Sequence, residues 1–274
     1  MNICFIGGGN MASAMIGGLL LNGTCKPGNI RVVEINDEAR RQIATRGVQV
    51  FAGQDEKAIQ GSDVVVLAVK PQGMKEVATQ LGPRLAAGQV VLSIAAGIRL
   101  SDLGRWLGNA EAGYALVRAM PNTPALVSAG MTGLYARKLD DMQRQRVEEI
   151  IRATGAFVWV GVEHNVDAVT AISGSGPAYF FYFIEALVQA GKELGLEDET
   201  ARQLALETAL GAAKLAHDSP EDPATLRARV TSKNGTTERA LLSMEANHVK
   251  QHIIAAAKAA AARAKEMGDE LGSA

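Results

Sequence analysis

The sequence predicts an α/β plus all-α protein, with a doubly wound N-terminal domain over residues 1–161 and a helical C-terminal domain over residues 162–274. Two observations predict this class. The first 160 residues alternate short, β-branched apolar runs with segments of helical period, which is typical of βαβ units around a parallel sheet. After Val160 the strand-like runs stop, and Ala-rich sequence at helical spacing follows.

Eight runs in the first domain are predicted to be strands of a parallel sheet. Several are apolar on both faces, as expected of strands that are covered by helices on both sides. The predicted strands are residues 3–6, 30–35, 48–51, 64–69, 90–94, 114–118, 132–135 and 157–160, and the predicted covering helices are residues 12–22, 38–46, 74–81 and 142–153.

The second domain contains an aromatic segment, residues 179–183 (YFFYF), which holds five of the ten Phe and Tyr residues of the chain. A helix that is apolar on all faces must be buried on all faces. We therefore expect a second subunit to cover this helix in an obligate dimer. The alternative is a central helix in a self-contained bundle.

Charge and cysteine content narrow the expected partners and location. With 28 Lys and Arg against 29 Asp and Glu, the net charge is close to zero, which argues against nucleic-acid or anionic-membrane binding and favours a small ligand. The two cysteines, Cys4 and Cys25, do not form a disulfide framework. The N-terminus has no basic leader, and no apolar run reaches the ~18 residues of a membrane span, so we expect a cytoplasmic protein.

The first predicted strand is followed by a glycine-rich turn, residues 7–12 (GGGNMA), which matches G-x-G-x-x-A and opens a predicted helix. The first glycine permits the tight turn, the second leaves room for a pyrophosphate, and the final alanine allows close packing of helix and strand. The helix N-terminus offers N–H groups to the phosphates. This context predicts a Rossmann-like dinucleotide site that includes Gly7, Gly9, Asn10 and Met11.

Glu34 lies at the end of the second predicted strand, where an acidic residue hydrogen-bonds a ribose 2′-OH and repels a 2′-phosphate. This position favours NADH over NADPH. Asn36 and the basic pair Arg40 and Arg41 lie close enough in sequence to reach a 2′-phosphate, so the choice between NADPH and NADH stays open.

Two further loops follow predicted parallel strands at their carboxyl ends, where ligands of open α/β sheets collect. We expect them to contact the cofactor through Ala68, Val69, Lys70 and Pro71 of the first loop and Ala95, Ala96 and Gly97 of the second. The small residues of the second loop let a flat ring approach the backbone. Lys70 is equally well explained as a solvated surface lysine.

The helical domain contains two Gly-rich, hydroxyl-bearing loops at predicted helix starts, residues 173–177 and 231–238. Ser175 is expected to cap the first helix, and Thr236 or Thr237 the second. Such helix ends suit a carboxylate, although ordinary capping explains each loop taken alone.

The four histidines are scattered, and the sequence contains no metal-ligand cluster and no nucleophile elbow. Reduction of a protonated imine suits such a site, because the substrate carries its own proton and positive charge into hydride transfer, whereas a ketone requires a proton donor or Lewis acid.

Five segments together resemble the pyrroline-5-carboxylate reductase family in order along the chain. They are residues 2–12, 68–72, 118–124, 173–179 and 231–237. The resemblance implies an NAD(P)H-dependent imine reductase that makes L-proline from 1-pyrroline-5-carboxylate, the last step of proline biosynthesis. It also implies a Rossmann-like domain joined to a helical domain for substrate binding and dimerisation, and a homodimer that assembles further into a ring of dimers (a decamer).

The same resemblance implies the roles of individual residues. Thr237 would hydrogen-bond the imine nitrogen, and the backbone of residues 235–237 would hold the carboxylate. The active site would form between the cofactor of one subunit and this loop of its partner. The implied substrate-binding residues are Met120, Asn122, Glu163, Ser175, Ser232, Gly235, Thr236 and Thr237.

The chain departs from the commonest family pattern at two places. One is Lys233-Asn234, where Pro-Gly or Lys-Gly is frequent; Asn tolerates a left-handed backbone, so the loop shape can survive. The other is Glu34, where many members have a neutral polar or basic residue.

Two other functions stay open on the residues alone. A 3-hydroxyacid dehydrogenase shares the domain order and would need a catalytic lysine, for which Lys192 and Lys214 are the candidates. A non-catalytic dinucleotide sensor would bind the cofactor without turnover.

Overall fold

A computed structural model describes residues 1–108 and 114–273. Residues 109–113 and 274, which fall within the two predicted domains, lie outside this description. The chain forms two compact units, Met1–Ser175 with Ala260–Ala274, and Gly176–Ala259. The division comes later than residue 161 because residues 162–175 pack on the sheet, where Val166 and Ala171 are buried. The end of the chain also returns to the first unit.

The first unit contains one sheet, in which the described strands follow the order β3-β2-β1-β4-β5-β6-β7-β8. Each predicted strand is present, with shifts of a few residues at the ends. The bounds are β1 Ile3–Ile6, β2 Ile30–Val33, β3 Gln49–Phe51, β4 Val64–Leu67, β5 Val90–Ser93, β6 Ala115–Met120, β7 Gly130–Arg137 and β8 Gly155–Trp159.

The prediction of a wholly parallel sheet is wrong at one pair. β7 runs antiparallel to β6, with Leu116 opposite Arg137 and Met120 opposite Gly133, whereas the other neighbours are parallel. Only residues 121–129 join the two strands, with a short 3₁₀ helix η4 (Thr123–Val127) between them. A parallel crossover needs about a dozen residues or more, so this connection returns the chain antiparallel.

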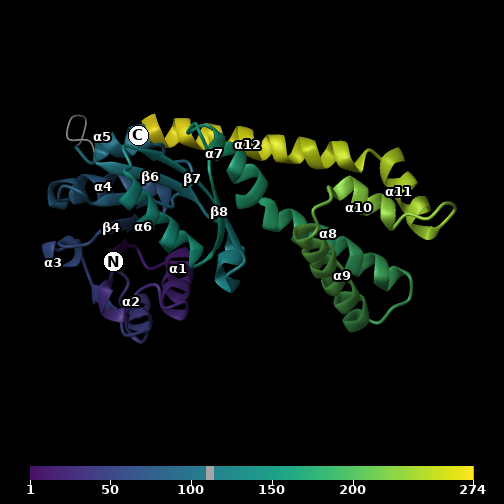
Figure 1. Cartoon of the computed structure of the whole chain (residues 1–274), viewed down its shortest axis with the longest axis horizontal. Helices are drawn as coiled ribbons and strands as arrows, with labels where there is room; N and C mark the ends of the chain where they lie inside the picture. The colour runs from purple at the N-terminus through teal and green to yellow at the C-terminus, as the bar shows by residue number, and fades with distance from the viewer. Residues whose placement is uncertain (109–113, 274) are drawn as a thin grey trace. The chain divides into compact units, whose positions relative to one another are not determined.

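Helices cover both faces of the sheet (Figure 1). The helices of the first unit are α1 Asn10–Leu21, α2 Asp37–Ala44, α3 Glu56–Ile59, α4 Met74–Leu81, α5 Leu100–Trp106, α6 Asp141–Arg152 and α7 Asn165–Val169, followed by a π-helical turn η5 Thr170–Gly174. Shorter 3₁₀ turns are η1 Pro27–Asn29, η2 Pro71–Gly73 and η3 Gly82–Arg84.

Successive residues of the central strands enter two different cores, because side chains alternate across a strand. The core under α1, α2 and α6 includes Ile3, Phe5, Ile16, Ile43 and Ile150. The core under α3, α4 and α5 includes Cys4, Ile6, Ile59, Met74 and Leu103. This double burial explains why β1 and β4 are uninterrupted apolar runs in the sequence, and why β5 is apolar up to its last residue, Ser93.

The second unit is helical. It contains α8 Gly176–Glu193, α9 Asp198–Asp218, α10 Pro223–Arg229, α11 Thr236–Ala246 and the start of α12 Val249–Ser273, whose last residues belong to the first unit. Phe180, Phe181 and Tyr182 of α8 are 68%, 64% and 75% exposed, so the chain by itself leaves this aromatic segment uncovered. Among the described residues, no helix is both long enough and apolar enough to cross a membrane.

Candidate active site

The glycine turn joins β1 to α1 and is held between the ends of two other strands. Gly7 has a φ of +101°, and a Cβ on it would lie 2.6 Å from the carbonyl oxygen of Ala68. Its N–H donates to the carbonyl of Val33 at 2.8 Å. Only glycine fits this backbone and this approach. The turn therefore sits beside the ends of β2 and β4, at the point where the strand order reverses and α/β proteins bind ligands.

The start of α1 fits the pyrophosphate of a dinucleotide. Gly9 is the N-cap residue, with an extended ψ of −175° and no side-chain cap, and a Cβ on it would meet no atom within 4 Å. Gly9 and Asn10 are exposed, whereas Ala12 is buried against the sheet. The first turn thus has no capping side chain and has open space beside Gly9 at the positive end of the helix, which suits an anion.

The Glu34 side chain lies directly against the glycine turn. Its Oε2 accepts a hydrogen bond from Gly8 N at 2.9 Å, and its Oε1 accepts one from Asn36 N at 2.8 Å. The Asn36 side chain is the N-cap of α2 and accepts a hydrogen bond from Ala39 N at 2.9 Å. Glu34 is therefore fixed beside the turn, while Asn36 is engaged by its own helix.

The two other predicted cofactor loops follow β4 and β5. Ala68 N donates to the carbonyl of Ile6 at 2.8 Å, and exposed Lys70 is the N-cap of η2, which begins at Pro71. In the second loop Ala95 is buried and Gly97 has a φ of +76°. Since β1, β2, β4 and β5 are parallel neighbours, their carboxyl ends bring the predicted cofactor residues to one edge of the sheet. Their contacts with a cofactor stay predictions.

The last turns of α12 support the Gly97 loop, which the sequence did not predict. A Cβ on Gly97 would lie 3.0 Å from Leu271 and 3.3 Å from Met267. The Arg99 guanidinium donates to Asp269 at 2.6 Å. These partners are about 170 residues apart in the chain, and no local pattern connects them.

The predicted substrate residues Met120 and Asn122 are locked to the first hydroxyl-bearing loop. Asn122 is 8% exposed; its Nδ2 donates to the carbonyl of Ser173 at 3.0 Å, and its Oδ1 accepts from Met131 N at 2.8 Å. A Cβ on Gly174 would lie 2.7 Å from Met120 Cε. Ser175 ends the π-helical turn and donates from its backbone N to Thr170 O at 2.8 Å. These contacts fix the relative position of the two segments.

Glu163 takes part in a partly buried charge network around Arg118. Its Oε1 accepts from Leu100 N, in the first turn of α5, at 2.6 Å and lies 3.7 Å from Arg118 Nη1. Arg118, only 3% exposed, also pairs with Asp167 at 2.8 Å. The carboxylate thus holds α5 and Arg118 in place. The predicted substrate contact of Glu163 stays a prediction. The role of Arg118 was missed, although an arginine inside an apolar strand is the signal that marks it.

The loop before Thr237 belongs to the second unit and adopts a shape that its sequence permits. Asn234 has a φ of +62°, as expected of an Asn in the place of glycine, and Glu238 Oε2 accepts from Asn234 N at 2.7 Å. The N-cap of α11 is Gly235, without a side-chain cap, so the expectation that Thr236 or Thr237 caps this helix is wrong. A Cβ on Gly235 would lie 2.4 Å from Ser232 Oγ and 3.0 Å from the Ser232 carbonyl oxygen, so the loop is tightly packed at this glycine.

As a consequence, Thr236 and half-buried Thr237 lie in the first turn of α11. Their hydroxyls accompany first-turn N–H groups that no capping side chain occupies. This arrangement suits a carboxylate next to a hydroxyl donor or acceptor.

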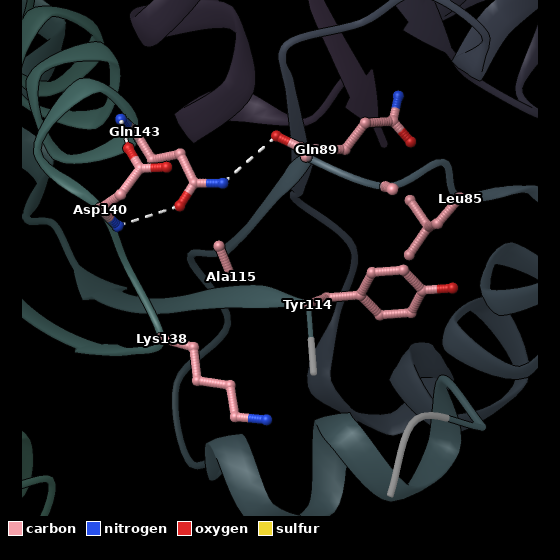
Figure 2. Close-up of a pocket in the computed structure, with 9 residues that line it drawn as sticks. Leu85, Gln89, Tyr114, Ala115, Lys138, Asp140 and Gln143 are labelled. Carbon is pink, nitrogen blue, oxygen red and sulfur yellow. Dashed lines mark hydrogen bonds between the residues drawn. The ribbon is translucent and has the colours of Figure 1, made fainter. Parts of the chain in front are cut away.

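A separate hollow lies at the opposite edge of the sheet (Figure 2). There Gln143 closes a capping box with Asp140 and donates from Nε2 to Gly88 O at 3.3 Å. The hollow is lined by Leu85, Ala87, Gly88, Gln89, Tyr114, Ala115, Lys138, Asp140 and Gln143. Because it adjoins the amino ends of β5 and β6, it is not the edge where dinucleotides bind.

Comparisons with known proteins agree with this geometry. A model described as pyrroline-5-carboxylate reductase dimerisation matches residues 163–267, and one described as NADP oxidoreductase, coenzyme F420-dependent, matches residues 2–97. A pyrroline-5-carboxylate reductase of Pseudomonas aeruginosa is 45% identical over 271 residues and covers 98% of each chain, and one of Pasteurella multocida is 42% identical with the same coverage.

A solved structure is similar over nearly the whole chain. The pyrroline-5-carboxylate reductase of Coxiella burnetii superimposes with a TM-score of 0.90 at 41% identity and covers 97% of this chain and 98% of its own. The Plasmodium falciparum enzyme, solved with NADP bound, gives 0.85 at 28% identity and 98% coverage of both chains. The predicted fold class is confirmed.

Proposed function

Because this chain belongs to the pyrroline-5-carboxylate reductase family, we propose that the glycine turn and the Thr237 loop are the cofactor and substrate parts of its active site. The protein is an NAD(P)H-dependent oxidoreductase that reduces the C=N bond of 1-pyrroline-5-carboxylate to give L-proline. The observation that carries this assignment is the match to reductases of this family over 98% of both chains.

Hydride transfer to a protonated imine requires no acid or base from the protein side chains. The glycine turn and the loops after β4 and β5 would hold a reduced nicotinamide cofactor, which when bound would supply the hydride that the imine carbon receives. The iminium nitrogen arrives protonated, so the electron pair of the C=N bond moves onto nitrogen without a proton donor from the protein. The Thr237 hydroxyl oxygen accepts a hydrogen bond from the iminium N–H and holds the ring in register during transfer.

The start of α11 is the proposed carboxylate site. Gly235 leaves the first-turn N–H groups uncapped, and the hydroxyls of Ser232 and Thr236 lie in the same loop. A charge-assisted hydrogen bond contributes about 1.5–3 kcal/mol, so two or three of them suffice to orient the substrate. Ser175, Met120, Asn122 and Glu163 are proposed to complete the substrate surroundings.

The protein is a homo-oligomer, as its dimerisation domain requires. The exposed aromatic segment of α8 is the surface that we expect the partner to cover. Assembly into a ring of dimers and a cytoplasmic location are proposed on family resemblance. Light scattering at micromolar concentration measures the mass of the assembly. A mass equal to one chain contradicts the homo-oligomer.

Replacement of Thr237 tests the proposed mechanism. Thr237→Ala is expected to lower kcat for 1-pyrroline-5-carboxylate about ten- to a thousandfold, the range of a lost transition-state contact. Thr237→Ser keeps the hydroxyl and should restore most of the rate. Ser243→Ala removes an exposed hydroxyl from the same helix and serves as the control. Unchanged kinetics in Thr237→Ala would remove this residue from the mechanism.

Complementation tests whether the site is shared between subunits. Gly7→Val cannot adopt the turn, and Thr237→Ala lacks the hydroxyl, so each variant alone keeps at most about a tenth of the wild-type activity. In a mixed dimer of the two, a shared arrangement leaves one site with an intact turn and an intact loop. We expect about a quarter of the wild-type activity from random assembly, since half the dimers are mixed and each has one working site. If each chain forms its own site, the mixture stays at or below about a tenth of the wild-type activity.

A further inference from the structure

Glu34, at the end of β2, bears on the choice between NADH and NADPH, which the sequence left open. Glu34 is half-buried, and two backbone N–H groups hold its carboxylate, from Gly8 at 2.9 Å and from Asn36 at 2.8 Å. One of these donors belongs to the glycine turn itself. The carboxylate is therefore positioned before any cofactor arrives, at the place where a Rossmann-like site receives the adenosine ribose.

Gly8, which has no side chain, leaves room for the close approach of Glu34. A Cβ on Gly8 would lie 3.2 Å from Glu34 Oε2 and 2.2 Å from Ile43 Cδ1. Gly8 is the variable position of the G-x-G motif, so its glycine is not needed for the pyrophosphate. Its glycine instead leaves room for the Glu34 carboxylate and for the Ile43 side chain of α2.

Two of the neighbouring cations, Arg40 and Arg46, have partners within the protein. Arg40 donates to the Glu34 carbonyl at 2.8 Å and pairs with the Asp37 carboxylate. Arg46 donates to the carbonyl of Ser13 at 2.6 Å. Asn36 caps α2 through its side chain. The groups that were candidates to receive a 2′-phosphate thus have partners, apart from exposed Arg41, and the group fixed at the site is an anion.

We infer that Glu34 makes this enzyme select NADH over NADPH. The carboxylate accepts hydrogen bonds from ribose hydroxyls, whereas the 2′-phosphate of NADPH would meet a like charge that is held in place by backbone donors. Asp37, which pairs with Arg40 at the start of α2, adds a second negative charge and so acts in the same direction. This inference rests on the proposed dinucleotide site and adds its specificity.

Binding of the oxidised cofactors tests the inference without turnover. Titration calorimetry with NAD⁺ and NADP⁺ is expected to give a Kd at least about tenfold lower for NAD⁺, and kcat/KM for NADH and NADPH should differ in the same sense. Glu34→Gln keeps an oxygen acceptor for the Gly8 N–H and removes the charge. It should narrow the preference about tenfold, chiefly by tighter binding of NADP⁺.

Glu38→Gln is the matched control, because it removes an exposed negative charge from the first turn of α2. Its cofactor preference should equal that of the wild type. Equal affinity of the wild type for both cofactors, or an unchanged preference in Glu34→Gln, would overturn the inference while imine reduction persists. Failure to bind either cofactor would overturn the dinucleotide site itself.

Discussion

Gly18 is the place where α1, the helix that presents the glycine turn, touches the rest of the domain most closely. A Cβ on Gly18 would lie 2.1 Å from the carbonyl oxygen of Ala153, about 1.3 Å short of the 3.4 Å at which ordinary contact begins. The obstacle is backbone, so α1 itself must move. Overpacking of this kind costs about 1–3 kcal/mol, which exceeds the ~1 kcal/mol that alanine gains over glycine inside a helix.

The adjacent Gly17 provides the control. A Cβ there would lie 3.6 Å from Arg46 Nη1, an ordinary contact with the end of a flexible side chain. Gly17→Ala should therefore stabilise the protein by about 0.5–1 kcal/mol, and Gly18→Ala should destabilise it by about 1–2 kcal/mol. The two variants have the same composition and lie on one helix, so the opposite signs isolate the contact with Ala153.

Urea unfolding followed by circular dichroism measures both variants, at one fixed protein concentration because the protein is oligomeric. Gly18→Ala should also bind NAD⁺ more weakly, since a displaced α1 carries the glycine turn with it. An unfolding midpoint of Gly18→Ala equal to or above that of Gly17→Ala would refute the reasoning, because it would mean that the contact yields at no cost.

Three further outcomes follow from buried or capping groups. Arg118→Met should lower the free energy of unfolding by ~3 kcal/mol in urea titrations, because it leaves the carboxylate of Asp167 without its buried partner. A free energy of unfolding equal to that of the wild type would contradict a stabilising role of this charge network. Burial raises the pKa of Cys4 to about 12. In a Cys25→Ser background, a thiol reagent at pH 8 should therefore label Cys4 only after unfolding. Rapid labelling of the native protein would contradict the burial of Cys4 in the core. Hydrogen bonds, above all from Thr225, lower the pKa of the Asp222 carboxyl below its ordinary 3.8. The loss of stability in Asp222→Ala should therefore be complete above pH 3.8 and should vanish as the pH falls through the lowered pKa. A difference in stability that persists in acid would contradict this pH dependence.

Periodicity was sufficient to predict the sheet, and for a physical reason. β1, β4 and β5 are buried on both faces, so they appear in the sequence as short apolar runs between helices of regular period. The direction of β7 was not predictable in this way, because an antiparallel strand between parallel neighbours can be equally apolar. Its signal was the shortness of the link at residues 121–129.

The site was predictable where its chemistry is local and not where it depends on distant contacts. The glycine turn and Glu34 follow from their positions after two strands, whereas the support of Gly97 by Met267 and Leu271 joins segments that no spacing relates. The start of α11 shows a third case. Thr236 and Thr237 are good capping residues, yet Gly235 is the N-cap, in close contact with Ser232. The hydroxyls of Thr236 and Thr237 therefore do not cap α11 and are free to bind a ligand.

The second unit depends on another chain to bury its large apolar side chains. Its buried positions within the described chain are small residues, such as Gly191, Ala201 and Ala205, while large apolar side chains of α8 and α9, such as Phe181 and Leu210, are more than half exposed. The first unit, in contrast, has two cores of its own. The apolar area that stabilises the helical unit must therefore come largely from another chain. Since the proposed catalytic Thr237 belongs to this unit, the order of its loop depends on assembly, and activity and dimerisation should be lost together.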